Sequence, residues 1–160
     1  TLSSQEADAR TMITLLHLRD IARLQGFSFS LVTEFLDGRN AALVQTERAD
    51  DFVVSDRLVG LMITQVSENK NLFAVLHELY RSEGSEIHMK PATHYVKLGL
   101  PVNFYSIVKA AMRRGETAIG YKILADANNA SKSYGVVLNP VKSRKQSFSE
   151  QDKVIVLAES

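Results

Sequence analysis

Two short amphipathic helices are predicted one after the other between Val53 and Gly84, and they most constrain how this chain folds. Apolar residues recur there at helical spacing. The first helix carries Leu58, Leu61, Met62 and Val66, and the second carries Leu72, Val75, Leu76 and Leu79. Such helices either pack in the core of one globular domain or form a connector whose apolar face another subunit buries. Position motivates the connector, because α/β patterning precedes the pair and a β-rich pattern follows it.

Capping signals bound both predicted helices. Ser55 or Asp56 is expected to cap the first, because a short polar side chain accepts a hydrogen bond from a free N–H one turn further on. Asn69 or Asn71 is expected to cap the second, and Gly84 is expected to end it. Together these signals predict two separate short helices rather than one long one.

The segment before the two helices alternates between helical and strand patterns. Ser3 and Glu6 fit an S-x-x-E capping box at the start of a helix that Gly26 ends. A wide apolar face on this helix comprises Met12, Ile13, Leu15, Leu16, Leu18, Ile21 and Leu24. A strand at 27–36, a turn at Asp37-Gly38, a helix at 39–48 and a strand at 51–54 are expected to follow. The alternation favours parallel strands joined by right-handed crossovers, so this segment predicts half of a doubly wound α/β sheet.

The segment after the two helices predicts an α+β arrangement. A strand is expected at 85–89, at a sheet edge because Pro91 cannot donate to a ladder, with Tyr95 and Val96 as candidates to continue it. Asn103 introduces a helix at 104–114 that Gly115 ends. Its inner stripe comprises Phe104, Ile107, Val108 and Ala111. Further strands are expected at 117–124, 134–138 and 153–158, separated by loops at 126–133 and 141–150.

Composition limits the classes of protein and partner. The 160 residues suffice for one domain or two small lobes, and 45% of them are apolar, which allows a packed core. The formal net charge of +1 gives no general attraction to nucleic acid, so no nucleic-acid partner is expected. There is no cysteine, which excludes disulfides and thiolate metal sites. No apolar run reaches the roughly 20 residues that cross a bilayer, so we expect a soluble piece, excised from something longer because it opens on Thr1.

The titratable side chains form no recognisable metal or catalytic pattern. The histidines at 17, 77, 88 and 94 are scattered, whereas a zinc site needs three or four converging ligands. Two small clusters of acidic residues occur, one at Glu47, Asp50 and Asp51 and one at Glu83 and Glu86. Either cluster could bind a hard cation through its carboxylate oxygens, but most such clusters are solvated surface. We expect no metal site and no catalytic residue, and therefore no enzyme.

A short basic loop carries Lys142, Arg144 and Lys145, with Arg113 and Arg114 as possible neighbours. Guanidinium groups fit phosphate oxygens, but a solvated mobile loop is the favoured interpretation, because the run is short and lacks interleaved aromatic residues. No two glycines form G-x-G, so neither the dinucleotide fingerprint nor a Walker loop is present. No serine lies in G-x-S-x-G.

Three segments together resemble a known family. They are Val53–Val96, Arg113–Ile123 and Gly135–Glu159. The most specific parts are the motif R-G-E-x-A-I-G-Y, then V-x-N-P, then a closing D-x-V-I-V-L. The chain resembles the cytosolic region of the Castor/Pollux family of ion channels, which is related to the RCK (regulator of K+ conductance, TrkA-like) domains.

The resemblance implies a three-part organisation. Residues 1–54 would be the C-terminal half of a Rossmann-like RCK lobe, 55–84 the helical crossover through which two such domains clasp each other, and 85–160 a small α+β C-terminal RCK lobe. Family domains of this kind form a ring beneath a membrane pore, and ligand binding changes the ring to open or close it. The implied partners are a second copy of the chain, as a homodimer or larger ring, and the pore domain of the same full-length chain, on the cytoplasmic side of a membrane.

Within that organisation two sets of residues are predicted to act. The interface set is Leu58, Leu61, Met62, Leu72, Val75, Leu76 and Leu79. The ligand-binding set is Arg113, Arg114, Tyr121 and Asn139, chosen because polar groups cluster beside the breaks at Gly120 and Pro140. The ligand itself is open, a cation or a nucleotide, and no cofactor is expected. The alternatives are a passive oligomerisation module and half of a nucleotide-processing enzyme.

Overall fold

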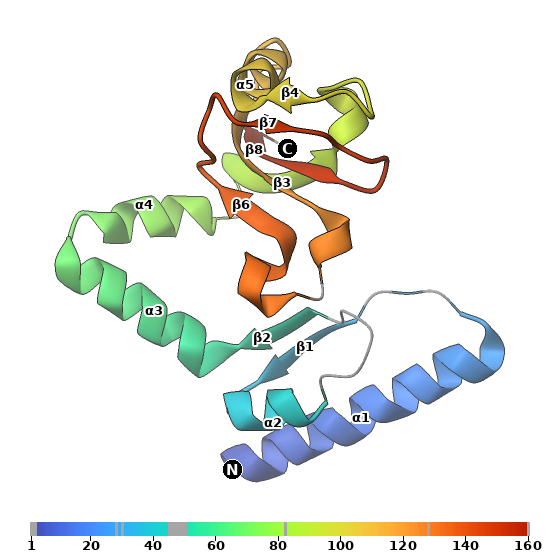
Figure 1. The fold of residues 1–160 in the computed structure, drawn as a ribbon. Coiled ribbons are helices and arrows are strands. Elements are labelled where there is room, and N and C mark those ends of the chain that lie inside the picture. The colour runs from blue at the N-terminus through green and yellow to red at the C-terminus, as the bar shows by residue number, and fades with distance from the viewer. Residues whose placement is uncertain are drawn as a thin grey trace. The chain divides into compact units, whose positions relative to one another are not determined.

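The computed structural model describes residues 3–27, 29, 31–44, 51–81, 83–127 and 129–159, without the side chains of Asp51 and Phe52. The chain forms two compact units, Thr1–Leu72 and Phe73–Ser160, each with its own sheet (Figure 1). The chain is mixed α/β, as the pattern predicts.

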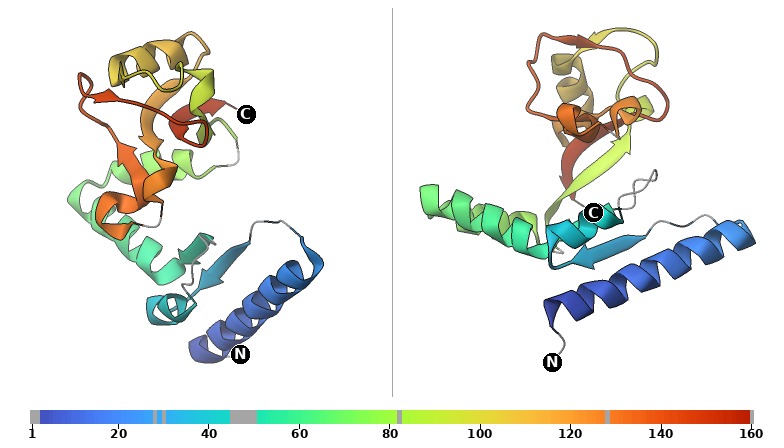
Figure 2. Two further views of the ribbon diagram at one scale, coloured as in Figure 1. Left: turned by 45° about the vertical axis from the view of Figure 1, so that its right-hand side comes forward. Right: turned by 60° about the horizontal axis from the view of Figure 1, so that its bottom comes forward.

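The first unit is built on a pair of parallel strands. Its elements are α1 (Ser4–Gln25), β1 (Val32–Phe35), α2 (Gly38–Leu43), β2 (Asp51–Val54) and α3 (Ser55–Glu68). The strands pair in register from Val32 opposite Asp51 to Phe35 opposite Val54. α1 runs alongside β1 in each view (Figures 1 and 2). The predicted order of helix, strand, helix and strand, with parallel strands, is confirmed.

Local signals explain both ends of α1 and the start of α2. Ser3 and Glu6 form the predicted capping box, and Gly26 ends α1 in the left-handed conformation, with φ of 67°. The strand predicted from residue 27 begins only at Val32, and Ser28 and Ser30 lie outside the described residues. The turn predicted at Asp37-Gly38 is a bend at Leu36 and Asp37 between β1 and α2, and Gly38 is the first residue of α2. Asp37 caps α2, because its carboxylate accepts the N–H of Arg39.

The expected cap of α3 is wrong. Val54 occupies the N-cap position, and no side chain caps the helix there. The Ser55 hydroxyl donates instead to the Glu34 carboxylate on β1. The side chain expected to cap the helix therefore forms a tertiary hydrogen bond. In the following turn the Asn69 side chain accepts the N–H of Asn71, while the Leu72 N–H donates to the Asn69 carbonyl.

The second unit contains a four-stranded antiparallel sheet in the order β3-β8-β5-β6. The strands are β3 (Ser85–Pro91), β5 (Thr117–Lys122), β6 (Val136–Leu138) and β8 (Lys153–Glu159), while β4 (Val102–Asn103) pairs with β7 (Lys145–Gln146). The helices are α4 (Leu72–Leu79) and α5 (Phe104–Met112), with 3-10 turns η1 (Ala92–His94), η2 (Leu124–Asp126) and η3 (Ala130–Gly135). β3 is an edge strand, as Pro91 predicts. α4 ends at Leu79, so Gly84 is not its C-cap.

The core of this unit lies between α5 and one face of the sheet (Figures 1 and 2). The buried core cluster comprises Ala92, Tyr95, Phe104, Ile107, Ala111, Ala118, Tyr121, Phe148, Val154, Val156 and Ala158. The predicted inner stripe of α5 is confirmed, with Val108 partly buried beside it. Tyr95 does not extend β3, because η1 turns the chain and buries its ring in the core. Gly120 is required where β5 passes β6, since a Cβ there would lie 2.3 Å from the Val137 carbonyl oxygen.

Candidate functional site

The predicted interface residues of α3 and α4 lie at the surface. Neither helix contains a buried residue. Leu58, Leu61 and Val75 are 46%, 56% and 53% exposed, and Met62, Leu72, Leu76 and Leu79 are half-buried. Removing one leucine side chain from water stabilises by about 1.5–3 kcal/mol, so these helices leave substantial favourable burial unrealised within each unit. Exposed apolar surface of this extent is typical of an interaction surface.

α1 presents a second apolar surface. The predicted wide face is only partly used, because Leu15 is buried and Met12 packs beside it, whereas other apolar residues point outward. The exposed ones are Ile13, Leu16, Leu18, Ile21 and Leu24. Parallel sheets in proteins are normally covered by helices on both faces. The two-stranded parallel sheet of this unit with one long helix beside it is therefore a small structure by itself. Exposed apolar residues on α1 alone thus outnumber the four apolar residues that the described core of the first unit buries.

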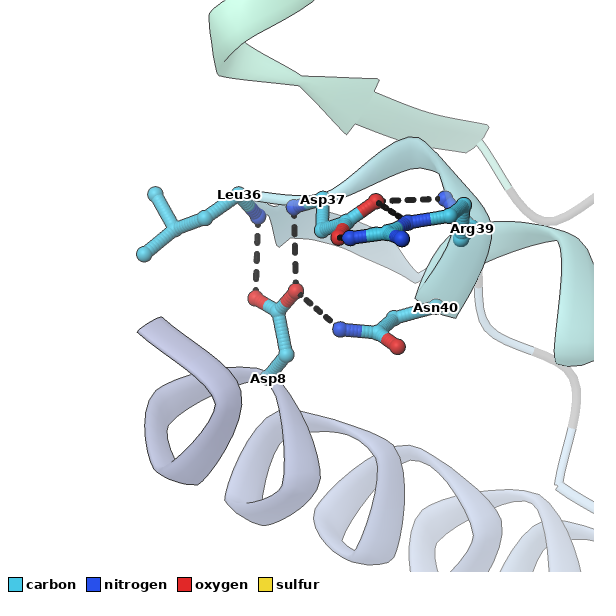
Figure 3. A network of polar contacts seen from close by, with 5 residues as sticks. All are labelled: Asp8, Leu36, Asp37, Arg39 and Asn40. Atoms are coloured by element: carbon cyan, nitrogen blue, oxygen red, sulfur yellow. Dashed lines mark hydrogen bonds and ion pairs between the residues drawn. The ribbon is translucent and has the colours of Figure 1, made fainter. Parts of the chain in front are cut away.

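A buried carboxylate joins α1 to the end of β1. Asp8 is 2% exposed and accepts hydrogen bonds from the backbone N–H groups of Leu36 and Asp37 at 2.9 and 3.0 Å and from Asn40 Nδ2 at 2.8 Å (Figure 3). Burial raises the pKa of Asp8, but the bonds from Asn40, Leu36 and Asp37 outweigh it, and the pKa lies below its ordinary value.

The Asp8 network bears on ligand binding. The carboxyl ends of strands are where open α/β sheets bind ligands. Here Asp8 takes the N–H groups of Leu36 and Asp37, and the Asp37 carboxylate takes both the N–H and the guanidinium of Arg39 (Figure 3). These donors are already satisfied, so the end of β1 is a structural junction and not an open anion site.

A second buried carboxylate organises the end of α5. Glu116 accepts hydrogen bonds from Lys90 Nζ at 2.8 Å and from the Tyr95 hydroxyl at 2.6 Å, and Arg114 Nε lies 3.7 Å from it. The Arg114 guanidinium also lies 5.7 Å from the centre of the Tyr95 ring. Burial raises the pKa of Glu116, but Lys90 and Tyr95 outweigh it and lower the pKa overall, while burial and Glu116 raise the pKa of Tyr95. Sequence reasoning singled out Arg114 but missed Lys90, Tyr95 and Glu116 as its companions.

The four predicted ligand-binding residues do not form one cluster. Tyr121 is buried and packs edge-on against Phe148, with ring centres 5.4 Å apart. Arg113 and Arg114 follow the last turn of α5. Asn139, with φ of 45°, instead accepts a hydrogen bond from Lys142 Nζ.

Lys142 locates Asn139 relative to α5. Its Nζ lies 4.7 Å from the centre of the Phe104 ring, at the first residue of the helix. Asn139 is therefore associated with the start of α5, and the two arginines with its end. Ligand binding by these four residues stays a prediction, but they do not converge on one ligand atom.

The remaining sequence candidates contribute no metal-like cluster. Across residues 3–44 and 51–159, apart from the undescribed positions, no three His, Asp or Glu side chains gather as metal ligands would. Glu47 and Asp50 lie outside the described residues. Glu86 lies 3.8 Å from His88 Nε2 rather than with Glu83, and the basic loop is exposed at Arg144 and Lys145.

Comparison with known proteins identifies relatives along nearly the whole chain. No protein-family model matches it. The chain is 31% identical to the ion channel CASTOR of Lotus japonicus over 98% of its own length and 21% of that protein. It is 32% identical to the probable ion channel POLLUX of Arabidopsis thaliana, over 96% of this chain and 21% of that protein. It is also 32% identical to the ion channel DMI1 of Medicago truncatula, over 98% of this chain and 20% of that protein. The chain thus spans about a fifth of the length of these curated relatives. Among the residues that the structure describes, no helix is both long and apolar enough to cross a membrane.

Proposed function

This chain belongs to the family of the CASTOR and POLLUX ion channels, and we propose that it forms part of a cytosolic ring that controls ion conduction. In this proposal residues 1–54 belong to a Rossmann-like RCK lobe, 55–84 form the crossover between subunits, and 85–160 form the C-terminal RCK lobe. The partners are further copies of the chain and the membrane pore of the full-length channel.

One observation carries the proposal, namely that α3 and α4 lack any buried residue although both are rich in leucine and valine. A second copy of the chain can cover these faces, since an identical apolar surface on both partners is self-complementary about a two-fold axis. The parallel β1–β2 pair adds support, because a pair of parallel strands needs neighbouring strands and covering helices to form a stable sheet.

The mechanism is mechanical rather than chemical. A ligand that binds one ring geometry more tightly than another shifts the population toward it by the difference in affinity. The apolar contacts of α3 and α4 would transmit that shift between subunits, because packed interfaces move between discrete arrangements and do not deform continuously.

The test is the mass of the chain in solution, measured by light scattering on a size-exclusion column at several concentrations. A dimer or larger species is expected for the wild type. Leu61→Asp and Leu76→Asp place a charge in the apolar contact and are expected to give monomers, while Thr64→Asp, on the polar side of α3, is expected to assemble normally. Folded Leu61→Asp and Leu76→Asp variants that stay associated would contradict assembly through these faces.

Two other functions are separated by ligand experiments. A passive assembly module would show no thermal shift with calcium, potassium, NAD or other nucleotides on the assembled full-length protein, whereas a sensor is stabilised by its ligand. An enzyme would turn over a nucleotide and lose that activity through one substitution in this region. The similarity to proteins named as ion channels favours the sensor over the enzyme.

A further inference from the structure

A pocket of about 490 Å³ lies in the second unit, and none of its lining residues belongs to the predicted ligand-binding set. It is lined by Met89, Lys122, Leu124, Glu150, Gln151 and Lys153. The volume falls in the range of small-molecule sites in proteins. The family resemblance assigned none of these residues a role.

The sheet register places the principal lining residues on one face. Lys122 and Lys153 stand directly opposite each other on β5 and β8, and Met89 pairs with Ile155 two residues along from Lys153. Tyr121 and Val154, their neighbours in sequence, point into the α5 core. Because successive side chains of a strand alternate, the two lysines and Met89 lie on the sheet face that α5 does not cover.

A buried carboxylate holds the two loops that complete the pocket. Asp152 is 3% exposed, and it accepts the N–H of Leu124 at 2.8 Å through one oxygen and the N–H of Ser149 at 2.7 Å through the other. Leu124 is thereby fixed at one side, and the loop that carries Glu150 and Gln151 is fixed at the other. The pocket walls are therefore held by hydrogen bonds to a buried residue and are not a chance gap between loops.

The charges in the pocket are not balanced. Like charges directly opposite each other on neighbouring strands are unfavourable. Neither Lys122 nor Lys153 forms an ion pair with another described residue, and the nearest acidic lining group, Glu150, lies unpaired on an exposed loop. The other polar lining residue, Gln151, is neutral. Two half-buried lysine residues thus line one pocket together with a single carboxylate residue, Glu150.

We propose that this pocket binds an organic phosphate, with the phosphate between Lys122 and Lys153 and the organic part against Met89 and Leu124. A phosphate monoester carries about −1.5 to −2 charges at pH 7, which matches two ammonium groups better than a single carboxylate does. The apolar side chains provide contact area for the organic part, and Gln151 can donate to it or accept from it. The claim that this molecule regulates a channel rests on the proposed function. The claim that it binds to the chain does not.

The first experiment titrates the 160-residue chain by calorimetry with AMP, glycerol 3-phosphate, inorganic phosphate and adenosine. AMP or glycerol 3-phosphate is expected to bind, and adenosine to bind at least about tenfold more weakly, since it lacks the charge-assisted contacts. A parallel sedimentation assay uses phosphatidylcholine vesicles with and without phosphatidic acid. Binding to the acidic vesicles alone identifies a lipid headgroup as the source of the phosphate, and AMP binding identifies a soluble molecule.

Matched variants decide whether the pocket is responsible. Lys122→Gln and Lys153→Gln are each expected to weaken binding about tenfold, while Lys109→Gln, at an exposed position of α5, leaves it unchanged. Without ligand, both pocket variants are expected to melt no lower than wild type, because each removes a like-charge repulsion. Equal weakening by Lys109→Gln, equal affinity for adenosine, or no binding of any probe at millimolar concentration would overturn the site. Failure of the Leu61→Asp test with intact AMP binding would overturn only the ring.

Discussion

The two units of this chain differ in how far each buries its own apolar residues. Among described residues, the first unit buries one cluster of four apolar side chains, and the second buries a cluster of eleven. The antiparallel sheet of the second unit is closed on one face by a helix from the same segment, whereas the parallel pair of the first unit leaves most of the apolar face of α1 open. An antiparallel sheet can be completed by local connections, but a parallel one requires further crossovers and covering elements.

The same contrast extends to their buried carboxylates. Asp8 is satisfied by neutral donors from the backbone and from Asn40, and Glu116 is satisfied by Lys90, Tyr95 and Arg114. In the first unit a carboxylate therefore joins elements that share few apolar contacts. In the second, it adds a charged network to a core that is already packed.

The largest expected effect is the loss of core packing in the second unit. Ile107 is 1% exposed, and Ile107→Ala is expected to lower the free energy of unfolding by about 2–5 kcal/mol. Leu100→Ala is the control, since Leu100 is 56% exposed and its truncation removes little packing. Urea unfolding followed by circular dichroism measures both. Equal effects for the two variants would mean that the second unit does not depend on the core between α5 and the sheet.

A smaller effect is expected at Asp8, and it is expected to be confined to the first unit. Asp8→Asn replaces one carboxylate oxygen by an amide nitrogen, so a donor then faces the donors that now bind Asp8. The packing of α1 on β1 is expected to lose about 2–3 kcal/mol of stability. Because the pKa of Asp8 is lowered on folding, its contribution is fully present above the ordinary value of 3.8 and is lost as pH falls through the folded value.

Hydrogen exchange resolved by segment measures this difference. Faster exchange at pH 7 in α1 and β1 of Asp8→Asn, with β5 and β8 unchanged, would sharpen the contrast between the units. Asp20→Asn, which removes only an exposed pair with Arg23, is the control. Equal acceleration in both units would show that they unfold together.

The smallest effect is expected at the Glu116 network. Tyr95→Phe removes the hydroxyl that donates to Glu116 and should cost about 1–2 kcal/mol, less than the core substitution because Lys90 still pairs with the carboxylate. Burial and Glu116 raise the pKa of Tyr95 above the ordinary value of 10.0, so its contribution is present below pH 10 and is lost as pH rises through the folded value.

Ultraviolet titration of the tyrosines tests this assignment. The last tyrosine to ionise should disappear in Tyr95→Phe, while in Tyr105→Phe, which removes an exposed ring, it should remain. A Tyr95→Phe chain whose most alkaline step is unchanged would contradict the Glu116 network.

Local sequence signals predicted many element positions. The capping box at Ser3, the left-handed Gly26, the edge position of β3 and the apolar stripe of α5 all depend on residues close in sequence. The failures involve competition from distant residues. Ser55 was expected to cap α3, but Glu34 accepts its hydroxyl, and Tyr95 was expected to extend a strand, but the core buries its ring.

For the candidate sites, the sequence predicted which kinds of residue are present but not which residues contact one another. The leucines of α3 and α4 could be predicted to form apolar faces, because periodicity is local. Strand register places Lys122 opposite Lys153. Chain reversal brings Lys90 and Tyr95 to Glu116, which accepts a hydrogen bond from each. Neither spacing nor composition specifies these contacts.

The sequence by itself determined the order of the main helices and strands, which helix faces are apolar, and that no cysteine chemistry is available. Tertiary structure alone decided which of those apolar faces are buried and which charges meet. The physical reason is range: propensity, caps and periodicity act within one or two turns, whereas burial and charge pairing depend on residues brought together from distant parts of the chain.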